Sequence, residues 1–219
     1  MKTKRISLFI ALFLCILGIQ AQEWRGFLEL TAGTSPAKSD INIQNKTFSN
    51  VCNPLSFGLN YTMGVQVIPQ LYAGAGIGGY TALLNYDREY GPERVFTALY
   101  FPVFVNARWI PDITKKINPF VDLKIGYQMG LDLDNIEIGY SYSYDSGRQC
   151  YIQHKNGMFL QPGVGVRFGR DSAFNLGIAY NVSMRREFVC KDLSQQSLPI
   201  VERISKNYGF LMVTFGADF

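Results

Sequence analysis

Residues 55–67 alternate strictly between two kinds of side chain. One set is small or polar and the other is apolar: Ser56, Gly58, Asn60, Thr62, Gly64 and Gln66 stand between Leu55, Phe57, Leu59, Tyr61, Met63, Val65 and Val67. Successive side chains on a β-strand point to opposite faces, so this segment predicts a strand with one apolar face and one mixed face.

The same two-faced pattern recurs along the chain and predicts an all-β fold, an eight-stranded antiparallel up-and-down transmembrane β-barrel. An amphipathic last strand that ends on an aromatic residue, as this one does on Phe219, is typical of an outer-membrane barrel. Pro102 donates no ladder hydrogen bond, so we expect a bulge there. The predicted strands are residues 24–32, 55–67, 71–80, 96–109, 119–130, 157–168, 173–182 and 208–219.

The connections between the predicted strands alternate between long and short. Long loops at one end and short turns at the other are typical of a transmembrane barrel. If the chain starts at the short-turn side, four aromatic residues fall at one membrane interface: Trp24, Trp109, Phe168 and Phe219. The long connections are residues 33–54, 81–95, 131–156 and 183–207, and the short ones are 68–70, 110–118 and 169–172.

Charged residues of the predicted strands all fall on the mixed face. The interior of an eight-stranded barrel is just wide enough to be filled by side chains, and buried charges must be paired. We therefore expect a charge network inside the barrel, with a narrow ion path as the alternative. The pattern alone also allows a soluble barrel with its apolar face inside. The set is Arg25, Glu29, Arg108, Asp122, Lys124, Arg167 and Asp218.

The beginning of the chain predicts a secretory signal peptide over residues 1–21 and a barrel domain over residues 22–219. Lys2, Lys4 and Arg5 precede an apolar run too short for a membrane helix. A lipid anchor at Cys15 is disfavoured because Leu14 stands where a small residue is needed. Cleavage removes three positive charges from a net charge of +4 and leaves +1, which indicates no nucleic-acid partner.

Cys52, Cys150 and Cys190 lie in the predicted long loops. Three cysteines allow at most one intramolecular disulfide, and we slightly favour Cys150–Cys190 over a bond that involves Cys52. No two cysteines have C-x-x-C spacing, so neither a metal site nor thioredoxin-type chemistry is expected.

Residues 136–144 alternate again, and Asp145-Ser146-Gly147 follows them. This pattern predicts a hairpin that continues beyond the membrane as a ribbon. Tyr140, Tyr142 and Tyr144 would form an aromatic face on it, available to a protein partner. The alternative is that the tyrosines pack against neighbouring loops.

His154 is the only histidine, and it is the candidate base for any enzyme that acts on membrane lipid. Such an enzyme needs a base beside a hydroxyl nucleophile and an orienting acid. No established motif links His154 to the residues of its loop, so we favour a solvated histidine and assign no catalytic residue. Residues 74–79 are rich in glycine but lie within a predicted strand, so no cofactor is expected. The loop residues are Glu137, Ser141, Ser143, Asp145 and Ser146.

Two strands and the last residue resemble the outer-membrane β-barrel family of Gram-negative bacteria, the small OmpA/OmpX-type, porin-like barrels. They are residues 101–109 (FPVFVNARW), residues 119–127 (PFVDLKIGY) and Phe219. The resemblance covers essentially the whole mature chain. It implies the cell outer membrane, contact with outer-membrane lipid, and insertion by the barrel-assembly machinery. The peptidoglycan-binding domain of OmpA itself is expected to be absent.

The resemblance says less about activity, because that family includes adhesins, integrity proteins, secretion components and lipid-modifying enzymes. We expect a non-enzymatic structural or surface-interaction role, in adhesion or assembly, with a protein partner at the extracellular loops. The alternatives are a lipid-modifying enzyme such as a lipid A deacylase or acyltransferase, a small pore or secretion-complex subunit, and a secreted lipocalin-like carrier.

Overall fold

The computed structural model describes residues 24–35, 41–43, 46–48, 51–88, 91–112, 114–132, 136–141, 148–170, 172–192 and 200–219. The predicted signal peptide lies outside these residues. No helix in the described ranges is long and apolar enough to cross a membrane. The strands are β1 (Trp24–Thr34), β2 (Ile41–Ile43), β3 (Lys46–Phe48), β4 (Val51–Ile68), β5 (Leu71–Arg88), β6 (Gly91–Trp109), β7 (Ile117–Asp132), β8 (Ile136–Ser141), β9 (Arg148–Lys155), β10 (Gly157–Phe168), β11 (Ala173–Asp192) and β12 (Ile200–Asp218).

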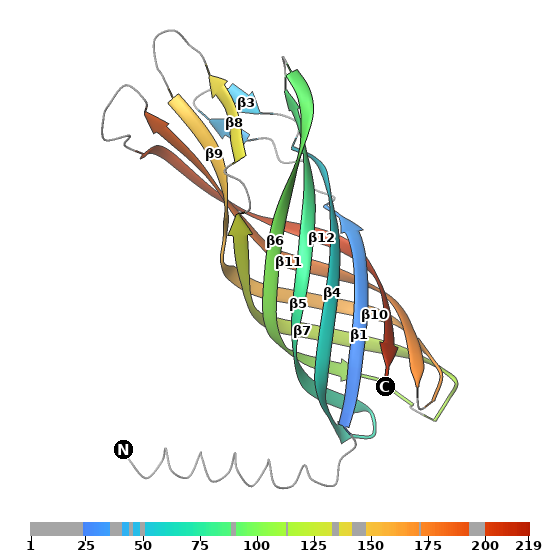
Figure 1. Ribbon diagram of the computed structural model, residues 1–219. Coiled ribbons are helices and arrows are strands. Elements are labelled where there is room, and N and C mark those ends of the chain that lie inside the picture. The colour runs from blue at the N-terminus through green and yellow to red at the C-terminus, as the bar shows by residue number, and fades with distance from the viewer. Residues whose placement is uncertain are drawn as a thin grey trace, which may run out of the picture.

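Eight of these strands form a closed antiparallel barrel, as the alternating pattern predicts (Figure 1). Their order around the ring is β1-β4-β5-β6-β7-β10-β11-β12, and the pairing of β12 with β1 closes it. Two backbone hydrogen bonds join Gly26 and Phe219 at 2.8 and 3.0 Å, so both ends of the barrel wall meet at the short-turn end. Closure leaves no open edge within the ring, which is the condition for a sheet to cross lipid.

The strands are strongly tilted relative to the barrel axis. The evidence is the register: residues paired from strand to strand around the whole ring do not lead back to the same residue. Starting at Thr31 of β1, the register partners on β4, β5 and β6 lead to Gly130 of β7. In the other direction, the register partners on β12, β11 and β10 lead to Phe120 of the same strand. The stagger is therefore ten residues for eight strands. A stagger of this size accompanies tilts of roughly 35–45° and an interior that side chains can fill.

The two faces of the wall are as the sequence predicts. Outward residues are large and apolar, such as Leu30 at 57 % exposure and Val105 at 62 %, whereas the inward Arg108 is 1 % exposed. A barrel with its apolar side chains outside and its charges inside is suited to a lipid bilayer, because such an exterior would expose a large apolar surface to water. The lipocalin-like alternative, with the apolar face inside, is therefore wrong.

The bulge expected at Pro102 is absent. The β6–β7 ladder steps evenly through the Pro102–Gln128 pair, and the β5–β6 ladder keeps its register on both sides of Pro102. Gly78 is the residue opposite Pro102 on β5, and a Cβ there would lie 3.1 Å from Pro102 Cγ. The absent side chain of Gly78 thus leaves room for the ring of Pro102. The strand therefore does not need the extra residue that a bulge would add.

Much of the chain predicted as long loops is strand. Residues 81–95 and 183–207 mostly belong to the hairpins β5–β6 and β11–β12, which continue beyond the ring (Figure 1). The alternation fades there because the strands leave the barrel wall. A bulge between Asn181 and Met184 marks the point at which β11 departs.

The ribbon predicted from residues 136–144 is present as far as the structure describes it, since β8 pairs with β9, and residues 142–144 lie outside the described residues. β9 in turn pairs with β11, so β8, β9, residues 184–192 and residues 200–208 form a four-stranded extension, the loop-side sheet. β2 and β3 form a separate short hairpin in the connection between β1 and β4.

The short turns at the opposite end are tightly anchored. Ile110 N donates to Gln70 O at 2.8 Å, and Gly169 N donates to Lys116 O at 2.8 Å. Gly169 has a φ of +122°, which an L side chain rarely adopts. Asp112 Oδ1 accepts hydrogen bonds from Thr114 N at 3.0 Å and Thr114 Oγ1 at 2.6 Å.

Candidate functional site

Arg108 of β6 is the centre of a charged layer inside the barrel. Its guanidinium forms ion pairs with Glu29 of β1, with Asp122 of β7 (Nε to Oδ1, 3.2 Å) and with Asp218 of β12 (Nη1 to Oδ1, 3.8 Å). The rings of Phe27 and Phe120 lie over it, with centroids 4.3 and 4.7 Å from Cζ. One cation of β6 therefore links its own strand to three other strands of the wall.

Lys124 of β7 completes one side of this layer. Its Nζ lies 2.7 Å from Glu29 Oε2 and also contacts Asp122. Asn106 Nδ2 donates to Asp122 Oδ1 at 2.7 Å, so this carboxylate is held from two neighbouring strands.

Arg167 of β10 completes the other side. Its Nε lies 2.6 Å from Asp218 Oδ2, and its Nη atoms donate to the carbonyls of Gly169 and Arg170 at 3.0 and 2.6 Å. Asn175 Nδ2 also donates to Asp218. The layer thus fixes β12 to the turn between β10 and β11.

Six of the seven charged residues predicted for the interior belong to this connected layer, and three are basic and three acidic. Each is at most 4 % exposed. The seventh, Arg25, lies on the same face at the short-turn end and is half-buried, and its carbonyl oxygen accepts a hydrogen bond from the Tyr72 hydroxyl at 3.4 Å. Mutual neutralisation is what allows so many charges to be buried. The connected members are Glu29, Arg108, Asp122, Lys124, Arg167 and Asp218.

A second layer of aromatic and amide side chains fills the interior further from the short turns. Tyr80 accepts a hydrogen bond from Asn60 Nδ2 at 2.6 Å and donates to Gln161 Oε1 at 3.2 Å. Phe159 packs against Tyr80 and Phe104, with ring centroids 5.9 and 5.4 Å away. Sequence reasoning did not single out this layer, although its members stand on the inward face of their predicted strands.

Together the two layers pack the described interior as a core. Arg108, Arg167, Tyr80, Tyr100, Phe159 and Phe210 are almost completely inaccessible, although they lie at different heights in the barrel. Among the described residues, no group of three or more histidine, cysteine, aspartate or glutamate side chains could hold a metal ion.

The four predicted interface aromatics lie at the short-turn end and point outward. Trp24, Trp109, Phe168 and Phe219 are 65, 48, 42 and 62 % exposed. The Phe219 ring stacks on Tyr61 at 6.4 Å between centroids. Their contact with a lipid headgroup layer stays a prediction.

The cysteines differ in their partners along the ladders. Cys150 of β9 and Cys190 of β11 are direct register partners in the loop-side sheet, whereas Cys52 of β4 stands opposite Asn85. We predict that the mature protein contains a Cys150–Cys190 disulfide, since directly opposite residues of an antiparallel pair have Cβ atoms about 4.5–5.5 Å apart and a small adjustment brings them to bonding geometry.

Thiol alkylation with and without reduction, followed by intact-mass measurement, checks this bond. The unreduced mature protein should expose one thiol, that of Cys52, and Cys190→Ser should expose two. Protection of Cys52 in the unreduced protein would contradict the assignment.

Of the predicted partner-contact tyrosines, Tyr140 pairs with Gln149 across the β8–β9 ladder. Tyr142 and Tyr144 lie outside the described residues. His154 is the register partner of Arg186 in the β9–β11 ladder. The residue opposite it is therefore a cation and not a carboxylate.

Comparison with solved structures finds the same architecture. The outer membrane protein OprG from Pseudomonas aeruginosa matches with a TM-score of 0.57 at 13 % identity over 90 % of this chain and 97 % of its own. Neisserial surface protein A matches with 0.51 at 12 % identity over 89 % and 95 %. The outer membrane protein AlkL, solved in DMPC bilayers, matches with 0.52 at 14 % identity over 90 % and 89 %. Neither a family model nor a curated protein matches the sequence.

These likenesses confirm the resemblance to the small OmpA/OmpX-type barrels at the level of the fold. With the apolar exterior and the buried charges, they identify the chain as an integral β-barrel of the outer-membrane type.

Proposed function

We propose that this barrel serves as a membrane anchor and that its function lies in the loop-side sheet, as a surface-interaction module for adhesion or assembly. The observation that carries this proposal is the division of the molecule into a packed barrel and a sheet that continues beyond it. Buried side chains pack the described interior of the barrel, whereas the loop-side sheet continues beyond the ring of eight strands.

The edge of that sheet supports a protein partner. β8 has one described strand partner, β9, so its second row of backbone groups is available to pair with an added strand. Edge strands are common sites for β-strand addition, in which main-chain hydrogen bonds give affinity. The sheet has an excess of basic residues, so we expect an acidic partner segment. The basic residues are Arg148, Lys155, Arg185, Arg186, Lys191, Arg203 and Lys206, and the acidic ones are Glu137, Glu187, Asp192 and Glu202.

Photo-crosslinking in intact cells tests this proposal. A crosslinking amino acid at position 137 of β8 should capture a defined protein, while the same group at position 94 of β6 should not. A variant in which a short turn replaces residues 136–152 should fold but lose binding to the purified captured protein. A variant shortened in residues 84–96 is the matched control. Equal binding by both shortened variants would overturn the proposal.

We propose no catalytic role for His154. A general base in a triad needs a carboxylate that orients the imidazole, and the residue opposite His154 in the ladder is Arg186. The lipid profiles of cells that express His154→Ala and wild type are expected to be identical.

The pore alternative gains no support from the packed interior. We predict that the refolded protein shows no unitary conductance in planar bilayers, because the charged layer and the Tyr80–Phe159 layer both fill the cross-section. Reproducible conductance steps from protein whose folding has been verified would restore the pore alternative.

A further inference from the structure

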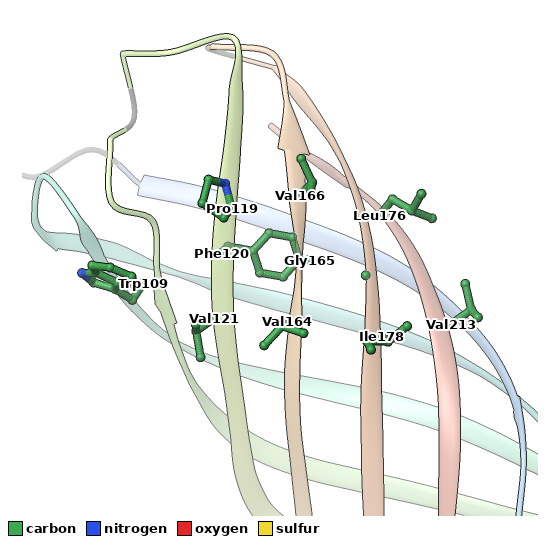
Figure 2. Close-up of a pocket in the computed structure, with 11 residues that line it drawn as sticks. Trp109, Pro119, Phe120, Val121, Val164, Gly165, Val166, Leu176, Ile178 and Val213 are labelled. Atoms are coloured by element: carbon green, nitrogen blue, oxygen red, sulfur yellow. The ribbon is translucent and has the colours of Figure 1, made fainter.

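A shallow apolar groove lies on the outer surface of the barrel near the short-turn end (Figure 2). Its volume is about 610 Å³, and it runs across the outer surfaces of β7, β10, β11 and β12, with Trp109 of β6 at one side. No charged side chain lines it. The groove therefore belongs to the part of the wall that faces the hydrocarbon of the membrane.

The floor of the groove is made of outward-facing aliphatic side chains. Val121, Val164 and Ile178 are β-branched, and Gly165 and Gly177 are partners across the β10–β11 ladder between them. Beneath Gly165 the Phe120 ring fills the space on the inner side, where a Cβ would come within 2.5 Å of its Cζ. Both glycines thus face the interior, and the outer floor beside them is formed by the flanking aliphatic side chains.

Aromatic rings border the floor. Trp109 lies on the β6 side, as Figure 2 shows. Phe174 of β11 and Phe215 of β12 stack on each other with centroids 6.1 Å apart. Leu176, which lines the groove, is the register partner of Phe215.

Two exposed cations stand at the short-turn end of the groove. Lys116 precedes the lining residue Pro119 by three positions, and Arg170 follows the lining residue Val166 by four. The hydrogen bond from Gly169 N to Lys116 O, at 2.8 Å, holds the two turns together.

Neither the Lys116 nor the Arg170 side chain has an ion-pair partner among the described residues. Lys115, by contrast, is paired with Asp112, with Nζ 3.5 Å from Oδ2. Asp171 follows Arg170 in the sequence and lies outside the described residues. Among the described residues, Lys116 and Arg170 therefore give this end of the groove a local positive charge.

We propose that the groove binds one acyl chain of an anionic phospholipid of the periplasmic leaflet, and that Lys116 and Arg170 bind its phosphate. This inference rests on the proposed function, because a loop-side sheet that acts at the cell surface puts the short turns on the periplasmic side. Three residues of strand span roughly 10 Å, or about 7 Å along the membrane normal at a tilt of about 45°. Headgroups occupy about 5–7 Å on each side of the hydrocarbon, so the cations lie at headgroup height when the groove lies in the acyl region.

Native mass spectrometry of the purified protein in mild detergent, titrated with phosphatidylglycerol or phosphatidylethanolamine, tests the site. We expect wild type to retain one phosphatidylglycerol, and Lys116→Gln/Arg170→Gln to bind it roughly 30-fold more weakly, since each cation near an anionic headgroup contributes a few-fold to ten-fold. Asp171→Asn should strengthen retention, because it removes a negative charge next to Arg170.

A groove-filling variant separates this site from general lipid contact. Val164→Trp should abolish retention of phosphatidylglycerol, while Val103→Trp, on an exposed position of β6 outside the groove, should leave it unchanged. Equal lipid retention by the two tryptophan variants would overturn the proposal. It would also be overturned if the wild-type protein were a dimer that Val164→Trp dissociates, because the groove would then be an interface between two copies of the chain. The variant that lacks residues 136–152 should still retain the lipid, so failure of this site and failure of the proposed surface role are distinguishable.

Discussion

Replacement of Arg108 by methionine is expected to lower the free energy of unfolding by about 3–5 kcal/mol, the range for removing one partner from a buried ion pair. The variant keeps an unbranched apolar stem but leaves Glu29, Asp122 and Asp218 with only Lys124 and Arg167 as counter-charges. Urea unfolding in detergent micelles, followed by the fluorescence of Trp24 and Trp109, measures the loss. These are the two tryptophans of the chain.

Two further variants show that the loss comes from unpaired charge. Lys115→Met removes an exposed cation whose side chain is 69 % accessible, and it should cost less than about 1 kcal/mol. Arg108→Met/Glu29→Gln restores neutrality, so its loss should be smaller than the sum of the two single losses by about 0.5–3 kcal/mol. Additive losses would show that Arg108 acts through packing against Phe27 and Phe120 alone.

The strands of the barrel could be predicted from the sequence because of their two environments. Lipid outside requires apolar side chains and the packed interior requires small or polar ones, so the two kinds of residue alternate along each strand. In residues 55–67 each outward position is apolar, and each inward position is small or polar. The inward charges could be predicted for the same reason, because a charge on the outward face of a strand would lie in hydrocarbon.

The loop-side sheet was harder to predict, because beyond the ring the strands neither face lipid nor enclose the barrel interior. Residues 84–95 and 183–207 carry no clear two-faced pattern, and most of them form strands by pairing with each other. The accommodation of Pro102 by Gly78 could not be predicted either, since it depends on which residue stands opposite in the ladder. The groove likewise needs the register, which sets its lining residues from neighbouring strands side by side.

An arginine at position 105 is expected to destabilise the folded protein in lipid by about 2–4 kcal/mol, the cost of a charged side chain on the outer wall of a barrel near the bilayer midplane. Val105 points outward from β6 at 62 % exposure, four residues from Trp109. At a tilt of about 45° it lies roughly 10 Å above the inferred interface, well inside the hydrocarbon.

Gln70→Arg is the matched control, because it adds the same side chain at an exposed position in a short turn. Unfolding of both variants in phospholipid vesicles compares a charge inside the apolar band with one outside it. We expect Gln70→Arg to lie within about 0.5 kcal/mol of wild type, as surface substitutions usually do. If Val105→Arg were equally stable, water would have to reach the outer wall at that height, and the assignment of the apolar exterior to the membrane would fail.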